Sequence, residues 1–219
     1  MSIERRGFSF KVGGIEDGMV AALKEYCASY RPDVATYGGE LDTKNLREAL
    51  DSLSARFPLY LVSYGDGEDK LLSPLGPEIG APREYLHGCS FSVICCDDNA
   101  RGEAERRRGA TGHVGVWQMI EDAQTALTRM QFVAVIRREG EADETVVLNT
   151  EPLNPAGIEH ITQLPELTAY AVHFDTAFVY STPDRRQPGA AVQEIEIEIF
   201  PSDHGSNSSR PGVLLGEQS

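Results

Sequence analysis

The sequence predicts a mixed α+β domain: a mostly antiparallel sheet packed by about three helices, with a C-terminal strand arm. Segments with helix period and strand period are mixed along the chain, without the steady alternation of a doubly wound parallel sheet. The 41% of hydrophobic residues in 219 suffices for a sizeable core. We expect an N-terminal arm over 1–13, an α+β domain over 14–183, a linker and strand arm over 184–200, and a flexible tail over 201–219.

The stretch from Ser90 to Met130 organises this domain. Its first part, Phe91–Cys96, has the length and β-branched content of a buried strand. A charged loop follows, and then a helix with one apolar face, formed by Val116, Ile120, Ala123, Leu127 and Met130. We therefore expect a central strand, a charged loop and a helix that packs on the sheet.

The other elements follow from the same periodicities. Apolar residues at every fourth position predict a helix over Ile15–Tyr30, and another helix is expected to begin at Asp42 or Thr43. Before the first helix, the alternation of Phe8, Phe10 and Val12 indicates a short edge strand or an arm. Strands are expected at 34–37, 59–64, 132–137, 145–148 and 167–180.

Two further expectations concern irregular backbone. The strand at 167–180 is long, which predicts a bulge or a bend near Asp175. Segments 71–83 and 154–157 are rich in proline and glycine or asparagine, so we expect loops there.

The net charge of −14 argues against general affinity for nucleic acid and against docking on anionic membranes. The chain has no run of 18 apolar residues, and its first residues, MSIERRGFSF, lack the apolar segment of a signal peptide. We therefore expect a protein that is made in the cytosol and used there or in a particle assembled there.

The cysteines and histidines do not form a metal-site pattern. None of the four cysteines has C-x-x-C spacing, and Cys95 and Cys96 point to opposite faces of the predicted strand. The five histidines are scattered singly, and His87 with Cys89 offers only two ligands. We expect buried thiols in a reducing environment, with no metal and no cofactor.

Catalytic motifs are also absent from the sequence. It has no phosphate-binding loop, no G-x-G-x-x-G and no G-x-S-x-G nucleophile elbow. Asp97 and Asp98 could be a carboxylate pair for acid–base work or Mg²⁺, as in a small hydrolase or nuclease. The favoured interpretation is a solvated strand end, because no second carboxylate motif supports the pair. We therefore expect no enzymatic activity.

Two segments are candidates for contacts between subunits. Arginines in the charged loop are candidates for a salt-bridge patch or a phosphate site: Arg101, Arg106, Arg107 and Arg108. The segment 192–200 alternates acidic and apolar residues, and its candidates are Glu194, Ile195, Glu196, Ile197 and Glu198. It could add to the sheet of a neighbouring subunit, or it could be an edge strand of its own sheet.

Several segments, in their order and spacing, resemble the Mu-like phage tail terminator family. They are IEDGMVAALKEY, VATYGGEL, FPLYLVSYGDG, the stretch from SFSVICCDDNARGEAERRRG to the end of the following helix, and LTAYAVHFDTAFVY. The resemblance covers most of Ile15 to Pro183, and the segment after Pro183 matches least well. It implies an α+β fold with helices on a mostly antiparallel sheet, and no catalytic residue.

The resemblance also implies a role and partners. Tail terminators form a ring, commonly hexameric, that caps the head-proximal end of the tail tube and sheath and joins the tail to the neck. The implied partners are further copies of the chain, the tube and sheath proteins, and neck or connector proteins. The implied location is the head–tail junction of a virion assembled in the host cytoplasm, where DNA passes through the ring without specific binding. The alternative is another head–tail connector or a tail-tube-like subunit.

Overall fold

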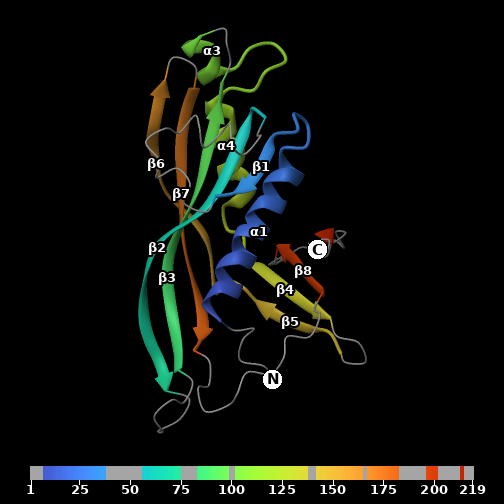
Figure 1. The fold of residues 1–219 in the computed structure, drawn as a ribbon, viewed down its shortest axis with the longest axis vertical. Helices are drawn as coiled ribbons and strands as arrows, with labels where there is room; N and C mark the ends of the chain where they lie inside the picture. Colours follow the sequence, from blue (N-terminus) through green and yellow to red (C-terminus); the bar gives the residue numbers. More distant parts are fainter. Residues whose placement is uncertain are drawn as a thin grey trace.

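A computed structural model shows two β-sheets and the helices that pack against them (Figure 1). It describes residues 7–37, 56–74, 83–98, 102–137, 142–164, 167–182, 196–201 and 213–214. The described helices are α1 (Phe8–Tyr26), α3 (Glu103–Arg108) and α4 (Val116–Leu127). The described strands are β1 (Asp33–Thr36), β2 (Leu59–Pro74), β3 (Arg83–Asp97), β4 (Phe132–Arg137), β5 (Glu144–Val147), β6 (Glu151–Leu164), β7 (Leu167–Ser181), β8 (Glu196–Pro201) and β9 (Val213–Leu214). The predicted α+β class is confirmed.

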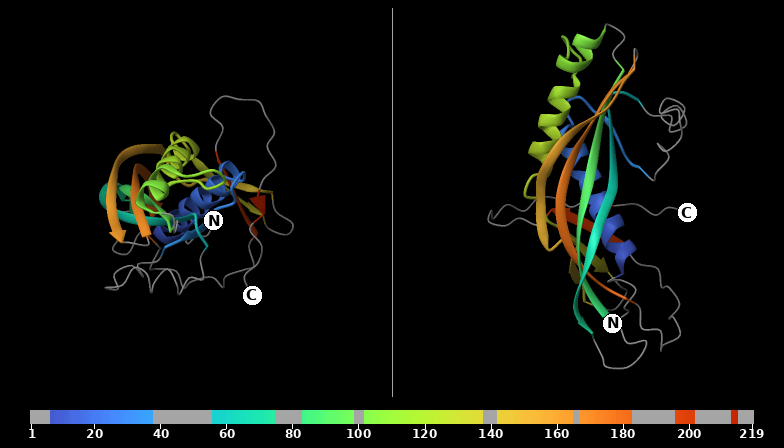
Figure 2. Two further views of the ribbon diagram at one scale, coloured as in Figure 1. Left: turned by 90° about the horizontal axis from the view of Figure 1, so that it is seen from above. Right: turned by 90° about the vertical axis from the view of Figure 1, so that its left-hand side faces the viewer.

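The larger sheet has five strands in the order β1-β2-β3-β7-β6. Every neighbouring pair is antiparallel except β1 and β2, which are parallel. Its four longest strands have 14 to 16 residues each, and they run along most of the molecule's length with a strong twist (Figures 1 and 2). Edge strand β1 is short, because it pairs only with Leu59–Val62 at the beginning of β2.

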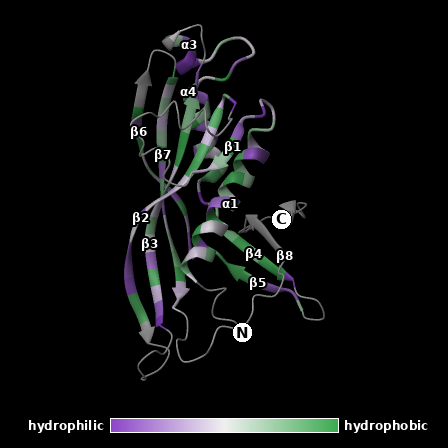
Figure 3. Ribbon diagram, viewed as in Figure 1, coloured by the Kyte–Doolittle hydropathy of each residue, from purple (hydrophilic) through white to green (hydrophobic). Residues whose placement is uncertain are grey.

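The smaller sheet has the order β5-β4-β8-β9 and lies on the other side of α1 from β6 (Figures 1 and 2). All of its described pairs are antiparallel. In β4, alternate residues face α1 and are buried: Phe132, Ala134 and Ile136. Strands β4 and β5 are mostly hydrophobic in Figure 3, so the face of this sheet that points away from α1 also carries apolar residues.

Helix α1 joins the two sheets, and it begins earlier than predicted. The alternation of Phe8, Phe10 and Val12 does not form an edge strand, because these residues make the first turns of the helix. The Gly13-Gly14 pair, at which the expected N-terminal arm over 1–13 ends, lies inside α1. Gly14 leaves space for Leu148 of the neighbouring segment, since an added Cβ would lie 2.9 Å from its side chain.

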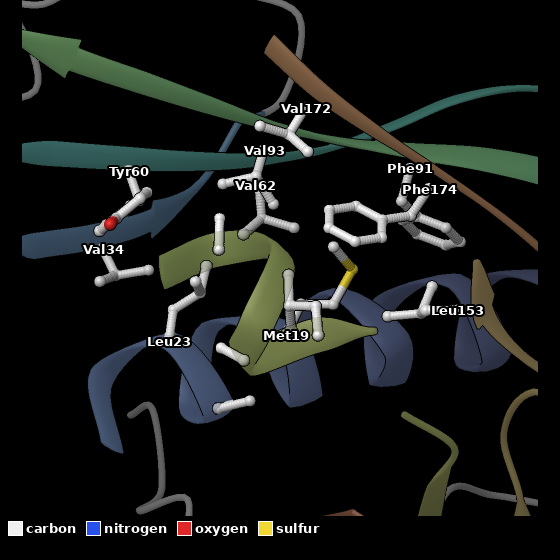
Figure 4. Close-up of a cluster of buried hydrophobic side chains, with 14 of the residues drawn as sticks. Met19, Leu23, Val34, Tyr60, Val62, Phe91, Val93, Leu153, Val172 and Phe174 are labelled. Carbon is white, nitrogen blue, oxygen red and sulfur yellow. The ribbon is translucent and has the colours of Figure 1, made fainter. Parts of the chain in front are cut away.

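The main core lies between the larger sheet and the two long helices (Figure 4). Helix α4 has the predicted face, with Val116, Ile120, Ala123 and Leu127 buried. On the sheet side, fully buried residues include Tyr60, Phe91, Val93, Val172 and Phe174. A second buried cluster on the opposite face of the same sheet consists of Leu59, Leu61, Ile94, Cys96, Leu167, Ala169 and Ala171.

Several expectations about irregular segments are wrong. Residues 71–74 continue β2, and 154–157 lie inside β6. The predicted irregularity near Asp175 belongs to the partner strand: β7 pairs evenly with β3, whereas β6 carries the extra residues at three register shifts. Pro155 and Gly157 flank one of these shifts, which is where a strand tolerates such residues. The helix expected from Asp42 or Thr43 lies outside the described residues.

Candidate assembly surfaces

The predicted charged loop contains a short helix, α3, at one end of the larger sheet (Figure 1). Glycines with positive φ flank it, Gly102 at 132° and Gly109 at 79°, and such angles strain other residues. An added Cβ on Gly115 would lie 2.6 Å from the carbonyl carbon of Arg108. The end of α3 therefore rests on the residue that precedes α4.

The arginines of the predicted basic surface differ in exposure. Arg106 is only 4% exposed, and its Nε donates to Oγ1 of Thr168 on β7 at 3.3 Å. That burial removes Arg106 from the predicted surface, because the bond to the sheet turns its side chain inward. Arg107 is partly buried and Arg108 is exposed, while Arg101 lies outside the described residues.

Asp97 and Asp98 do not form a carboxylate pair. Asp97 has no exposed surface, and its Oδ1 lies 2.8 Å from Nε2 of His113, whereas Asp98 is exposed. The interpretation as a solvated strand end therefore holds for Asp98 and is wrong for Asp97. Burial raises the pKa of Asp97 above its usual range, although the bond to His113 opposes this shift. The register partner of Asp97 is Thr168, so Asp97, His113, Thr168 and Arg106 close this end of the sheet together.

The cysteines are free and buried, as predicted. Cys95 belongs to the main core and Cys96 to the second cluster, which confirms that they point to opposite faces. Burial raises the pKa of Cys89 and of Cys96 to about 12, so both remain protonated thiols. In the described part of the chain, no three His, Cys, Asp or Glu side chains gather as a metal site would require. None of the helices in that part is long and apolar enough to span a membrane.

The acidic segment pairs within its own chain. β8 is antiparallel to β4, with Glu196, Ile197 and Glu198 opposite Arg137, Ile136 and Val135. Of the two alternatives that the sequence leaves open, the described residues 196–201 therefore form a strand of their own chain's sheet. Glu194 and Ile195 lie outside the described residues.

Sequence reasoning missed a polar cluster that holds the beginning of α1. His87 is 4% exposed, its Nδ1 lies 2.7 Å from Oδ1 of Asp69, and its Nε2 lies 2.8 Å from the Tyr64 hydroxyl. The Phe8 ring packs edge-on against the rings of Tyr64 and His87. Burial raises the pKa of the Tyr64 hydroxyl, which makes it a poorer nucleophile. The cluster therefore holds the beginning of α1 against strands β2 and β3. The pairing of β2 with β3 creates it, and no local motif marks it.

A second polar network lies inside the main core. The Tyr30 hydroxyl lies 2.7 Å from the Tyr60 hydroxyl and donates to Oδ2 of Asp122 at 2.9 Å. The Tyr60 hydroxyl donates to the carbonyl of Met119 at 3.1 Å. Burial raises the pKa of both tyrosines, so both stay protonated. The network fixes the turn that follows α1 against β2 and α4.

Comparison with known proteins gives one family. The family described as "Bacteriophage Mu, Gp37" matches residues 11–179. No curated protein matches the chain.

Proposed function

Since the chain belongs to the bacteriophage Mu Gp37 family, we propose that it is a tail terminator that closes into a ring. The family indicates a structural component of a phage virion and favours a non-enzymatic role. The ring is expected to cap the head-proximal end of the tail tube and sheath and to join the tail to the neck. Its expected partners are further copies of the chain, tube and sheath proteins, and neck proteins.

The observation that supports the proposal best is that family and fold agree over the same residues. The match from 11 to 179 spans nearly all of the chain between the beginning of α1 and the end of β7. These elements form sheets and helices around a main core that contains a buried polar network. Such a fold suits a structural subunit, which keeps one shape and offers its surface to neighbouring subunits.

Two further observations favour a ring. Head-to-tail contacts close into a ring only if each subunit carries two different, complementary surfaces. Two regions of this subunit differ in sequence, since arginine-bearing α3 lies at one end of the larger sheet and β8, with the sequence EIEIFP, belongs to the smaller sheet (Figure 1). The net charge of −14 also suits a ring through which DNA passes without binding.

Position in the particle tests the role. Cryo-electron microscopy of the virion should show one ring of this protein at the top of the tail. Removal of the gene should leave tails that fail to join heads. Stacked rings along the whole tail would instead identify a tube-like subunit, and a ring inside the neck would identify a connector. The neighbouring genes offer a cheaper test, because tube and sheath genes are expected beside this one.

A further inference from the structure

A serine, a histidine and a glutamate lie side by side on three neighbouring strands of the larger sheet (Figure 1). The hydroxyl oxygen of Ser92 on β3 lies 2.8 Å from Nδ1 of His173 on β7. On the other side of the ring, Nε2 of His173 lies 3.3 Å from Oε2 of Glu159 on β6. We call these three residues the Ser92 triad. A hydroxyl, an imidazole and a carboxylate in this order are the parts of an activated nucleophile, its base and the group that orients the base.

The carboxylate sets the direction of the hydrogen bond between the other two side chains. An ionised Glu159 only accepts protons, so it favours the tautomer of His173 that carries its proton on Nε2. Nδ1 of His173 then has a free electron pair, and the Ser92 hydroxyl donates to it. His173 is therefore placed to take the proton of Ser92 when the serine oxygen attacks an electrophile.

The Ser92 triad can be reached from solvent. The side chain of His173 is 30% exposed and that of Glu159 is 65% exposed, while Ser92 is partly exposed. The register partner of His173 on β6 is Gly157, and a Cβ added there would meet nothing within 4 Å. Register partners share one face of a sheet. The space beside His173 is therefore open to a small molecule.

A backbone group beside the triad is a candidate to stabilise the negative charge that acyl transfer places on a carbonyl oxygen. Ala156 is the extra residue at the register shift between Pro155 and Gly157, so it has no register partner on β7. The extra residue of a bulge is left outside the ladder of backbone hydrogen bonds. The N–H of Ala156 is therefore the candidate donor to this oxygen, and such donors supply much of the rate of acyl transfer.

The cluster of Tyr64, His87 and Asp69 has a similar composition but is unsuited to this chemistry. It lies on the opposite face of the sheet, since His87 and Ser92 are an odd number of residues apart on β3. His87 is 4% exposed, and the Phe8 ring packs against it. Burial raises the pKa of the Tyr64 hydroxyl, which makes the reactive anion harder to form. Tyr64 should therefore stay unmodified under conditions in which Ser92 reacts.

We propose that Ser92 is a nucleophile that accepts acyl groups from small activated esters, with His173 as its base and Glu159 as the residue that positions His173. The Ser92 oxygen bonds to the carbonyl carbon, and its proton passes to Nδ1 of His173. The bond from that carbon to the leaving oxygen then breaks, and the leaving group takes the proton from His173. Attack of water by the same route releases the acid and restores the serine. This activity goes beyond the proposed structural role and does not depend on it, because the triad belongs to a single chain.

The test exposes the full chain to p-nitrophenyl acetate and, separately, to a fluorophosphonate probe for activated serines. Peptide mass spectrometry should find the probe on Ser92, and Ser92→Ala should remove it. His173→Gln should slow the reaction by about 10²-fold or more, which is the usual contribution of a general base. The four cysteines are buried and burial raises the pKa of each, so their thiols should not compete.

The pH dependence of the rate tests the role of the base. The rate should fall as the pH is lowered and His173 takes up a proton, and His173→Gln should lack this fall. In the described part of the chain, the charged groups nearest to His173 on this face are the carboxylates of Glu159, Asp175 and Asp66. Glu159→Gln should slow the reaction, and Glu159→Asp should recover part of the rate because it restores the carboxylate.

A second serine provides the matched control. Ser90 lies on the same face of β3, and its hydroxyl donates to Oδ1 of Asp66 at 3.3 Å, so Ser90→Ala should react like the unchanged chain. Thermal unfolding checks that every variant is folded, and a chain unfolded in urea should not react with the probe. If folded Ser92→Ala or His173→Gln reacts as fast as the unchanged chain, the proposal is wrong, and the triad only joins three strands. Neither result bears on ring formation, which is measured separately.

Discussion

The two halves of the larger sheet differ in how many of their faces are covered. In the half near α3, Leu61 and Val62 are both fully buried although they point to opposite faces. In the half near the beginning of α1, Phe174 is fully buried while its neighbour Asp175 is exposed. Figure 3 shows the same contrast, with more hydrophilic residues towards the lower part of β2 and β3.

This difference explains why the strands show two sequence patterns. Continuous apolar runs such as VICC in β3 occur where both faces are covered, and alternation as in HFDT of β7 occurs where one face is polar. On the polar face, Ser92 contacts His173, and His173 pairs with Glu159 at 3.3 Å. The coverage of the sheet can therefore be tested one residue at a time.

The largest expected effect is at Phe174, in the half with one covered face. Phe174→Ala should lower the free energy of unfolding by about 3–5 kcal/mol, because it leaves a cavity under α1. Asp175→Ala, the matched control on the other face, should change it by less than about 0.5 kcal/mol. Denaturant unfolding measures both. Equal losses would mean that this half is covered on both faces.

In the half with two covered faces, substitutions on the second face should also lower the free energy of unfolding. Leu61→Ala should cost about 2–4 kcal/mol, since Leu61 is fully buried in the second cluster. Ser63→Ala, two residues along the same face and in the other half, should cost under about 1 kcal/mol. If Leu61→Ala is as mild as Ser63→Ala in urea unfolding, the second cluster contributes little to stability.

Helix α1 packs against both sheets, so its glycines test how tightly the smaller sheet is held against it. An added Cβ on Gly18 would lie 2.6 Å from the Phe132 ring, so Gly18→Ala should destabilise by about 1–3 kcal/mol. Gly13 has nothing within 4 Å of such a Cβ, and Gly13→Ala should be neutral or stabilise by up to about 1 kcal/mol. Thermal unfolding of the two variants side by side measures the difference. A neutral Gly18→Ala would mean that the smaller sheet packs loosely.

The smallest effect concerns pH and the buried end of the sheet. Because the pKa of Asp97 is raised, the folded state disfavours its ionised form. Its contribution to stability is therefore present below the usual carboxyl pKa and is lost as pH rises through the raised value. Asp97→Asn should be at least as stable as the unchanged chain at pH 7, and this advantage should vanish near pH 3. A variant that is less stable at pH 7 than at pH 3, relative to the unchanged chain, would contradict the assignment.

Most of the fold could be predicted from periodicity. The strand 132–137 and the helix from Val116 are correct because each buries one face whose period the sequence repeats. The errors lie where tertiary contacts override local signals. Gly14 lies inside α1, where it permits close packing against Leu148, and Pro155 indicates a loop but lies in an edge strand that tolerates it.

The candidate surfaces could be predicted only in part. The alternation around Glu196 and Glu198 is confirmed as a strand, but pairing with β4 is a long-range contact that no local pattern reports. The burial of Arg106 depends on Thr168, far along the chain. The contact of Trp117 with Tyr170 escapes sequence analysis for the same reason, since only the fold brings the two rings together.

Native mass spectrometry of the unmodified full chain, alone and with tail tube protein, tests the central claim most directly. The account predicts a closed ring of one stoichiometry, six copies being the number the resemblance implies, that does not grow as concentration rises. A chain that stays monomeric under both conditions, or that polymerises without limit, would contradict it.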